Sequence, residues 1–509
     1  MRIKTALIAA LWPASVVAQE PLSVIDWLGE AYANPGAGGF VLLEPPVAEA
    51  ALRPEVEVSP LESVATPLGL VAPEITGLPV DLWHGSDPQQ LIRLIGEVPV
   101  HDSPAMQSLL YTLLLAEKAP PATASDAEAD ALMLAQIDRL IALGAIDPAQ
   151  AMVELAGPTR NRALFRRWFD TTLLSGDEDR SCAVLQQIPD LAPHYAARIF
   201  CTARHGDWQT AALTLETAQA LELLPRPTLD LLDHFLNPEF FEGAAPLPAA
   251  VDPDPLTFRL FEAIGERMPS STLPRAFANA DLREIAGWRA QIEAAERLTR
   301  VGALNPNQLL GLYTDRKPAA SGGIWDRVAA VQRFDIALST GSAEAVAKTL
   351  PTAWTQMRAA RLEVPFAHLF ADRLAAIPLQ DAAAALAWQI RLLAPDYEAA
   401  SHQAPGNSRA QSFLGALAQG APGRADPPDD QARAIALGFG DASAVPPELT
   451  TALKDGRLGE VILRAIGLFD RGARGNPTEL TAALATLRRV GLEDTARRAA
   501  LQLMITGRG

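Results

Sequence analysis

The sequence lacks the residue strings that identify most catalytic and cofactor sites. It contains no His-Glu-x-x-His, Gly-x-Ser-x-Gly, Walker A or Gly-x-Gly-x-x-Gly string, which are the patterns of zinc peptidases, serine hydrolases, phosphate-binding loops and dinucleotide-binding folds. Its seven histidines are scattered, and no two have the His-x-x-x-His spacing that places two ligands on one helix face. The sequence therefore predicts no catalytic residue, no cofactor and no metal site.

Basic residues are also scarce. The chain has 43 Lys and Arg against 60 Asp and Glu, only five of the basic residues are Lys, and the formal net charge is −17. Nucleic acids and anionic lipid surfaces are bound through clustered Lys and Arg. The composition therefore argues against both as partners.

Long apolar runs are absent after the first 18 residues. Within those residues, Arg2 and Lys4 precede an apolar run over 6–17, which ends at the small residue Ala18. This order is typical of a cleaved secretory signal, and the run is shorter than the ~20 residues that span a bilayer. We predict a signal peptide at 1–18, a periplasmic or secreted protein, and no membrane span after cleavage. The alternative is a buried N-terminal helix.

Only two cysteines are present, and they do not form a Cys-x-x-Cys redox motif. Cys182 and Cys201 flank a proline-marked turn, Pro189 to Pro193, at nine and ten residues from its centre. In an antiparallel helical hairpin such positions lie level with each other, and exported proteins meet oxidising conditions. We predict a disulfide; the alternative is a pair of reduced, buried cysteines.

Proline is plentiful, with 41 residues, and divides the chain. It recurs every few residues before residue 80, where helices cannot propagate. We predict a proline-rich extended arm over 19–85, whose apolar islands at 24–28, including Trp27, and at 68–71 lie against the protein or a partner. A second proline-marked segment predicts a linker over 401–428.

The remaining chain has the pattern of helical hairpins. Gly144, Gly176 and Gly206 recur at spacings of 32 and 30, each followed five residues later by a small residue and nine residues later by an apolar one. Gly491 repeats this arrangement near the C-terminus. The glycine lets the chain leave a helix in a left-handed conformation, and the small residue permits close packing of the next helix.

The hairpin pattern resembles the tetratricopeptide repeat (TPR), whose period is 34 residues. The residues Gly206-Asp207-Trp208 and Ala211 match its turn and second helix best, whereas the aromatic positions of its first helix match poorly. The resemblance covers about a third of the chain, and it implies a stack of helix pairs with a concave face.

A longer duplication is also indicated. The residues around Gly144 recur around Gly302 at an offset of 158, and those before Gly176 recur before Gly341 at an offset of 165. We predict an all-α fold, an α-solenoid of TPR-like hairpins in two related halves; chance similarity between Ala- and Leu-rich helices is the alternative. The predicted units are a first half at 86–240, a second half at 255–400 and a C-terminal helical module at 429–509.

Two further strings are candidates for binding a partner. Phe165, Arg166 and Arg167 belong to an aromatic-rich stretch that could serve as a peptide anchor, although a helical core with two exposed arginines explains it better. The string Ser321-Gly322-Gly323-Ile324-Trp325 suits a loop that holds an anion on backbone amides, or simply a loop and helix start. With Trp27, these residues form the candidate partner-binding set.

Several longer strings resemble an uncharacterised family of exported alphaproteobacterial proteins. They are Pro21–Leu28, Thr76–Pro79, Pro274–Phe277 and Ala320–Arg327, and the resemblance extends over most of the chain. That family has no established activity, so the resemblance implies export but no site residues.

The expected function is that of a periplasmic helical-repeat scaffold or regulator that binds protein partners of the cell envelope. The alternative is a peptidoglycan- or glycan-acting enzyme with a helical superhelix. Such an enzyme needs a catalytic Glu followed by Ser, yet Glu479 precedes Leu480 and Glu493 precedes Asp494. A binder of small ligands or polysaccharides is a third possibility, which several exposed Trp on one face would favour.

Overall fold

The computed structural model describes residues 67–100, 102–440 and 444–508, and within them the fold is all-α. The signal peptide, Trp27 and most of the predicted arm lie outside the described residues. Two isolated β-bridges join Leu68 to Lys118 and Val71 to Ala116. No helix in the described ranges combines the length and the hydropathy needed to cross a membrane.

The described chain begins with a segment that packs on the helical body. The apolar island at 68–71 lies beside the end of α4, where Leu70 and Val71 each donate a backbone hydrogen bond to Leu115. Val71 is buried, so this island does lie against the protein. The short helix α2 (Pro73–Thr76) follows, and then α3 (Pro88–Glu97) and α4 (Pro104–Leu115).

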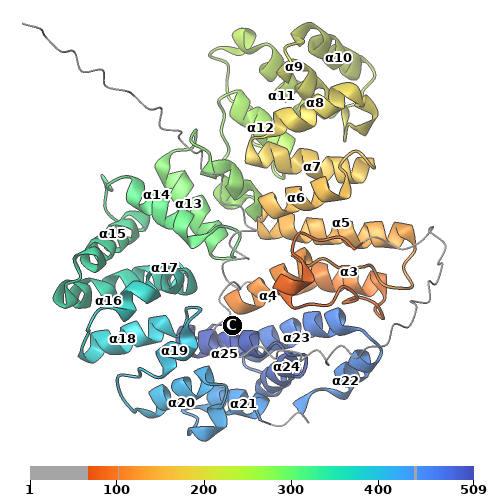
Figure 1. Cartoon of the computed structure of the whole chain (residues 1–509). Coiled ribbons are helices and arrows are strands. Elements are labelled where there is room, and N and C mark those ends of the chain that lie inside the picture. Colours follow the sequence, from red (N-terminus) through yellow and green to blue (C-terminus); the bar gives the residue numbers. More distant parts are fainter. Residues whose placement is uncertain (1–66, 101, 441–443, 509) are drawn as a thin grey trace, which may run out of the picture.

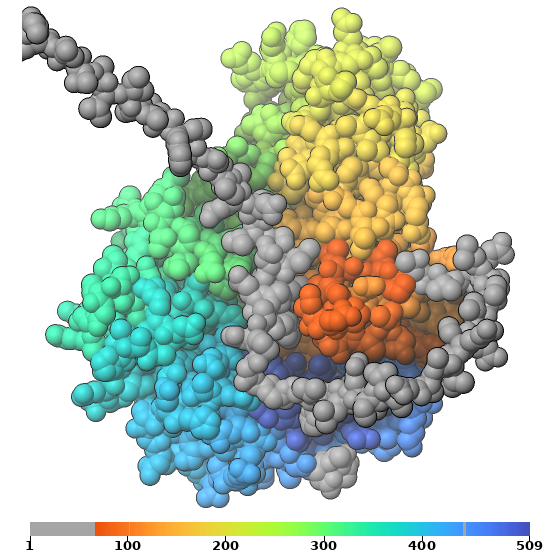
Figure 2. Space-filling model, viewed as in Figure 1, coloured from red at the N-terminus to blue at the C-terminus, as the bar shows by residue number. Residues whose placement is uncertain are grey.

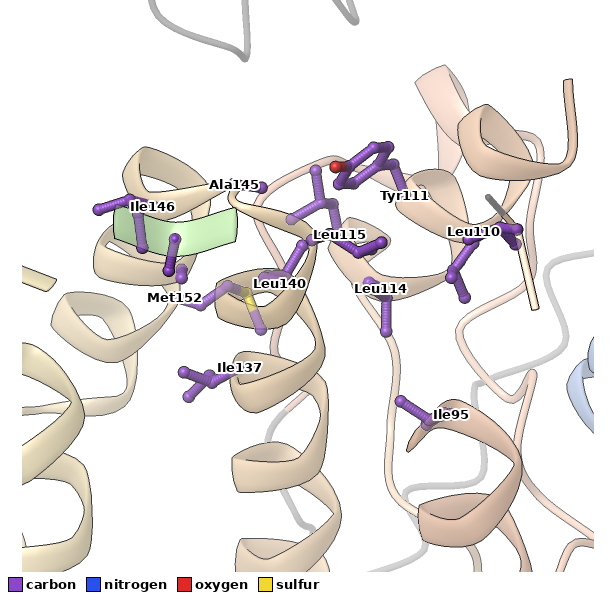
Figure 3. Close-up of a cluster of buried hydrophobic side chains, with 14 of the residues drawn as sticks. Ile95, Leu110, Tyr111, Leu114, Leu115, Ile137, Leu140, Ala145, Ile146 and Met152 are labelled. Carbon is purple, nitrogen blue, oxygen red and sulfur yellow. The ribbon is translucent and has the colours of Figure 1, made fainter. Parts of the chain in front are cut away.

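A first series of helical hairpins follows α4. Each helix contacts the next, and Figure 1 shows them stacked from α5 beside the N-terminal helices to α10 at the far end. Figure 3 shows the start of this stack, where Leu115 of α4 lies beside Leu140 of α5 and Ile137 lies on the other side of α5. The bounds are α5 Asp126–Leu143, α6 Ile146–Ala156, α7 Arg162–Ser175, α8 Glu178–Gln187, η1 Pro189–Leu191, α9 Tyr195–Arg204, α10 Trp208–Ala220, α11 Arg226–Leu236, η2 Pro238–Phe241 and α12 Pro255–Ala263.

The repeated glycines lie at the helix ends where the spacing predicts turns. All six have a positive φ, between 67° and 96°, which residues with a Cβ rarely adopt. They are Gly144, Gly176, Gly206, Gly302, Gly341 and Gly491. The small and apolar residues that follow the first three glycines are all buried, as close helix packing requires; they are Ala149, Ser181, Ala211, Val153, Leu185 and Leu215.

The predicted disulfide is present. Cys182 on α8 and Cys201 on α9 are bonded, with their Cα atoms 4.9 Å apart and both side chains buried. The turn between the two helices contains η1, close to the predicted centre at residue 191. The bond therefore joins two level positions of one antiparallel hairpin.

A second series of hairpins begins after an irregular segment of 3-10 helix, which contacts the first series through α5 and α7. The amide of Asn279 in this segment donates to the carbonyl of Gly144 at 2.9 Å. The bounds are η3 Ser270–Thr272, η4 Arg275–Leu282, α13 Trp288–Thr299, α14 Pro306–Asp315, α15 Ile324–Thr340, α16 Ala343–Ala359, α17 Glu363–Ala375 and α18 Asp381–Arg391.

The C-terminal part differs from the sequence prediction at 401–428. This segment was expected to be a linker, but it contains a full helix, α20, whose Phe413, Leu414 and Leu417 are buried. The prolines at 405 and 422 leave a proline-free interval long enough for three turns. The bounds are α19 Tyr397–Ser401, α20 Arg409–Ala418, η5 Pro422–Arg424, α21 Asp430–Gly438, α22 Pro447–Lys454, α23 Leu458–Ala473, α24 Pro477–Arg489 and α25 Glu493–Thr506.

The two ends of the described chain meet. Helices α23 and α25 pack against α3 and α4, as Figure 1 shows for the orange and blue segments. The indole of Trp83 is buried directly over Gly459. The amide of Gly459 donates a hydrogen bond to the carbonyl of Leu82 at 2.9 Å. The amide of Ala105 donates a hydrogen bond to the side chain of Gln502 at 2.9 Å. The stack of hairpins is therefore closed between its first and last helices.

Candidate functional site

The first string of candidate residues lies on α7 and is largely structural. Phe165 is fully buried and packs against Trp168 with ring centroids 5.7 Å apart, so it is a core residue and the prediction of a partner anchor is wrong for it. Arg167 donates two hydrogen bonds to Asp138, at 2.8 and 2.7 Å. Arg166 is exposed, with its Nε 3.9 Å from Asp170.

The second string borders a cleft. The loop at Ser321–Gly323 leads into α15, and together with η3 and α13 it lines a hollow of about 790 Å³. Proteins commonly bind small molecules in cavities of ~300–1,000 Å³. Trp325 lies on one wall, packed against Trp288 of α13 with ring centroids 5.0 Å apart. The structure thus places Ser321, Gly322, Gly323 and Trp325 together at one concave surface.

The loop itself is already capped by its own chain. The amide of Gly322 donates to the Asp326 carboxylate at 3.0 Å. Gly322 and Gly323 both have positive φ, which allows the sharp entry into α15. An anion held by this amide would therefore compete with Asp326, so the Ser-Gly-Gly loop is a wall of the cleft rather than its binding group.

The charged side chains of the cleft divide into paired and unpaired groups. Glu296 is buried and accepts from Arg327, at 2.7 Å to each carboxylate oxygen, and from the hydroxyl of Tyr313. Asp281 is buried and binds Arg267 at 2.5 Å, and Glu293 binds Arg289 at 2.8 Å. Each acidic group that lines the cleft is therefore engaged with an arginine.

Two arginines on the same wall have no such partner among the described residues. Arg297 donates to the carbonyls of Ser270 and Leu273, and Arg300 donates through Nε to the carbonyl of Ala360 at 2.9 Å. Burial lowers the pKa of Arg297, and the neighbouring charges of Arg275 and Arg300 lower it further. This wall therefore concentrates positive charge in a chain that is acidic overall.

A second surface, which sequence reasoning missed, lies at the far end of the first hairpin series. Thirteen large hydrophobic side chains are exposed in the described chain, and eight of them fall between Ile188 and Val251. Figure 2 shows this segment, yellow to light green, projecting from the rest of the molecule. The eight are Ile188, Tyr195, Trp208, Leu213, Leu221, Leu223, Phe240 and Val251.

The same segment is strongly acidic. Between Ile188 and Asp254 the chain contains ten Asp and Glu and three Arg, with no Lys. Exposed apolar groups that are concentrated in one region mark interaction sites more often than scattered ones do. We call the segment Ile188–Asp254 the acidic tip.

In the described ranges no three His, Cys, Asp or Glu side chains come together as metal ligands do. The chain matches no family model, and comparison with curated proteins and with solved structures finds no match either. The geometry described above is therefore the basis for any functional proposal.

Proposed function

We propose that this protein is a periplasmic helical-repeat scaffold that binds a protein partner of the cell envelope through the acidic tip. The concentration of exposed hydrophobic side chains in that segment is the observation that carries the proposal. The partner would present a basic, partly apolar segment, because the tip offers apolar contacts within a field of carboxylates.

The proposed compartment is supported by two independent features. The predicted signal peptide would direct export, and disulfides such as the one between Cys182 and Cys201 persist mainly in oxidising compartments. A binding role is supported by the hairpin architecture, since stacked helix pairs present extended surfaces for protein partners. In this proposal the two hairpin series are related halves of a TPR-like solenoid that is closed by the C-terminal helices.

The proposal is tested by comparing two matched pairs of exposed residues. Leu213 and Leu221 in the acidic tip are each 63% exposed, whereas Ile336 and Leu437, elsewhere on the molecule, are 64% and 60% exposed. Replacing either pair by Ser removes similar apolar area from water-exposed positions. The two double variants should therefore differ in binding and not in folding.

The expected result is that capture of the partner from crosslinked cell envelopes is lost in the Leu213→Ser/Leu221→Ser variant. Interface anchors typically contribute more than ~1 kcal/mol each, so affinity should fall about tenfold or more. The Ile336→Ser/Leu437→Ser variant should retain wild-type capture. Equal capture by all three proteins would overturn the proposal.

A further inference from the structure

The cleft beside the Ser-Gly-Gly loop is lined by residues that all lie outside the acidic tip. Its lining includes Arg297 and Arg300, neither of which has an ion-pair partner among the described residues; Arg297 donates instead to two backbone carbonyls. Partly buried cations normally acquire a counter-ion, since burial of an isolated charge is unfavourable. A negatively charged group at this wall would therefore be stabilised.

The local acidic residues do not supply that charge. The negative charge of Glu296 does act on Arg300, but its oxygens are engaged with Arg327 and Tyr313. Asp281 is held by Arg267 and by the hydroxyl of Ser270. Arg275 adds a further positive charge that acts on both Arg297 and Arg300. The balance at this wall is positive.

We infer that the cleft binds a small anionic molecule, which presents a carboxylate or phosphate group to Arg297 and Arg300 and an apolar or ring portion to Trp325. Guanidinium groups recognise these two oxyanions through parallel N–H···O bonds. Arg300 is suited to this role because its only hydrogen bond in the described structure uses Nε, which leaves both Nη atoms to donate to a ligand. The hollow of about 790 Å³ is larger than an inorganic ion requires, and so accommodates a larger molecule.

Inorganic phosphate and citrate are suitable probes, because they separate the two oxyanion chemistries. The full exported protein is titrated with each probe at constant ionic strength, with chloride as the reference salt, and binding is measured by isothermal titration calorimetry. Saturable binding of either probe in the millimolar range is expected, and the tighter probe identifies the preferred oxyanion. Absence of saturable binding by both would overturn the inference.

Two variants locate the site. Arg300→Gln should weaken binding about tenfold or more, because a hydrogen bond to a charged group contributes ~1.5–3 kcal/mol. Arg316→Gln removes the same charge from an exposed position next to Asp315, outside the cleft, and should bind as wild type does. Equal weakening in the two variants would mean that only the overall charge matters, and would refute the site.

A second readout keeps the test independent of how the variants fold. In protein labelled with 5-fluorotryptophan, the resonance of Trp325, assigned through Trp325→Phe, should shift on addition of the bound probe. The resonance of Trp208, which lies in the acidic tip, should stay unchanged. A titration that moves Trp208 and leaves Trp325 in place would contradict the inference.

Discussion

The closure between the first and last helices can be tested with two alanine substitutions in one helix. Gly459 and Gly467 both lie on α23. A Cβ at Gly459 would lie 2.1 Å from a ring carbon of Trp83 and 2.9 Å from Leu82, whereas one at Gly467 would meet only the Arg471 side chain, at 3.6 Å. The two substitutions therefore have opposite expected effects on stability.

The magnitudes follow from these distances. Carbon atoms in contact normally lie ~3.5–4.0 Å apart, so Trp83 or the start of α23 must move by about 1.5 Å to admit the new methyl group. Overpacking of this kind costs about 1–3 kcal/mol. Gly467→Ala meets no clash, and replacing a glycine inside a helix by alanine stabilises it by about 1 kcal/mol.

Calorimetric thermal unfolding and limited proteolysis are the assays. We expect a lower apparent Tm and faster cleavage within residues 79–100 for Gly459→Ala, because those residues pack directly on α23. We expect an unchanged or higher Tm for Gly467→Ala. If both variants unfold and are cleaved as the wild type is, the contact between Trp83 and Gly459 does not exist in solution, and the closure is wrong.

Two further predictions concern a covalent bond and a buried charge. Replacing Cys182 and Cys201 together by Ala opens the loop that the disulfide closes, whose sequence separation is 19. On the chain-entropy model this should lower the free energy of unfolding by about 3 kcal/mol. Amide exchange in α8 and α9 should then accelerate about a hundredfold, and unchanged exchange would refute the prediction. Burial lowers the pKa of Lys118 from 10.5 to about 7, while its Nζ donates to the carbonyls of Leu114 and Ala116. Between about pH 7 and pH 10 the unfolded state therefore holds more protons at Lys118 than the folded state, so the free energy of unfolding should rise with pH across this window. Urea unfolding at a series of pH values should show this rise in the wild type and not in Lys118→Met, and equal slopes would contradict it.

The features that the sequence predicts correctly are local. The spacing of Gly144, Gly176 and Gly206 defines hairpins because each glycine acts within a few residues of its helix end. The disulfide follows from the same reasoning, since a hairpin brings Cys182 and Cys201 level. Both conclusions depend only on helix geometry and on contacts within a single helical hairpin.

The features that the sequence does not predict depend on distant contacts or on exceptions to burial. The closure joins Trp83 to Gly459, and no periodicity connects residues so far apart in the chain. Helix α20 was missed because its flanking prolines suggested a continuous linker. The acidic tip was missed because apolar residues such as Leu213 are expected to be buried, and only the structure shows that they are exposed. The cleft was indicated by the Ser-Gly-Gly string, but its arginines come from a different helix.

Photo-crosslinking in living cells shows whether the acidic tip binds a protein partner. A photoreactive phenylalanine analogue replaces Leu213 in one strain and Ile336 in another, since these two side chains are equally exposed. We predict that position 213 yields one discrete crosslinked species containing a second protein, and that position 336 yields none. No crosslink at 213, or the same species at both positions, would contradict the account.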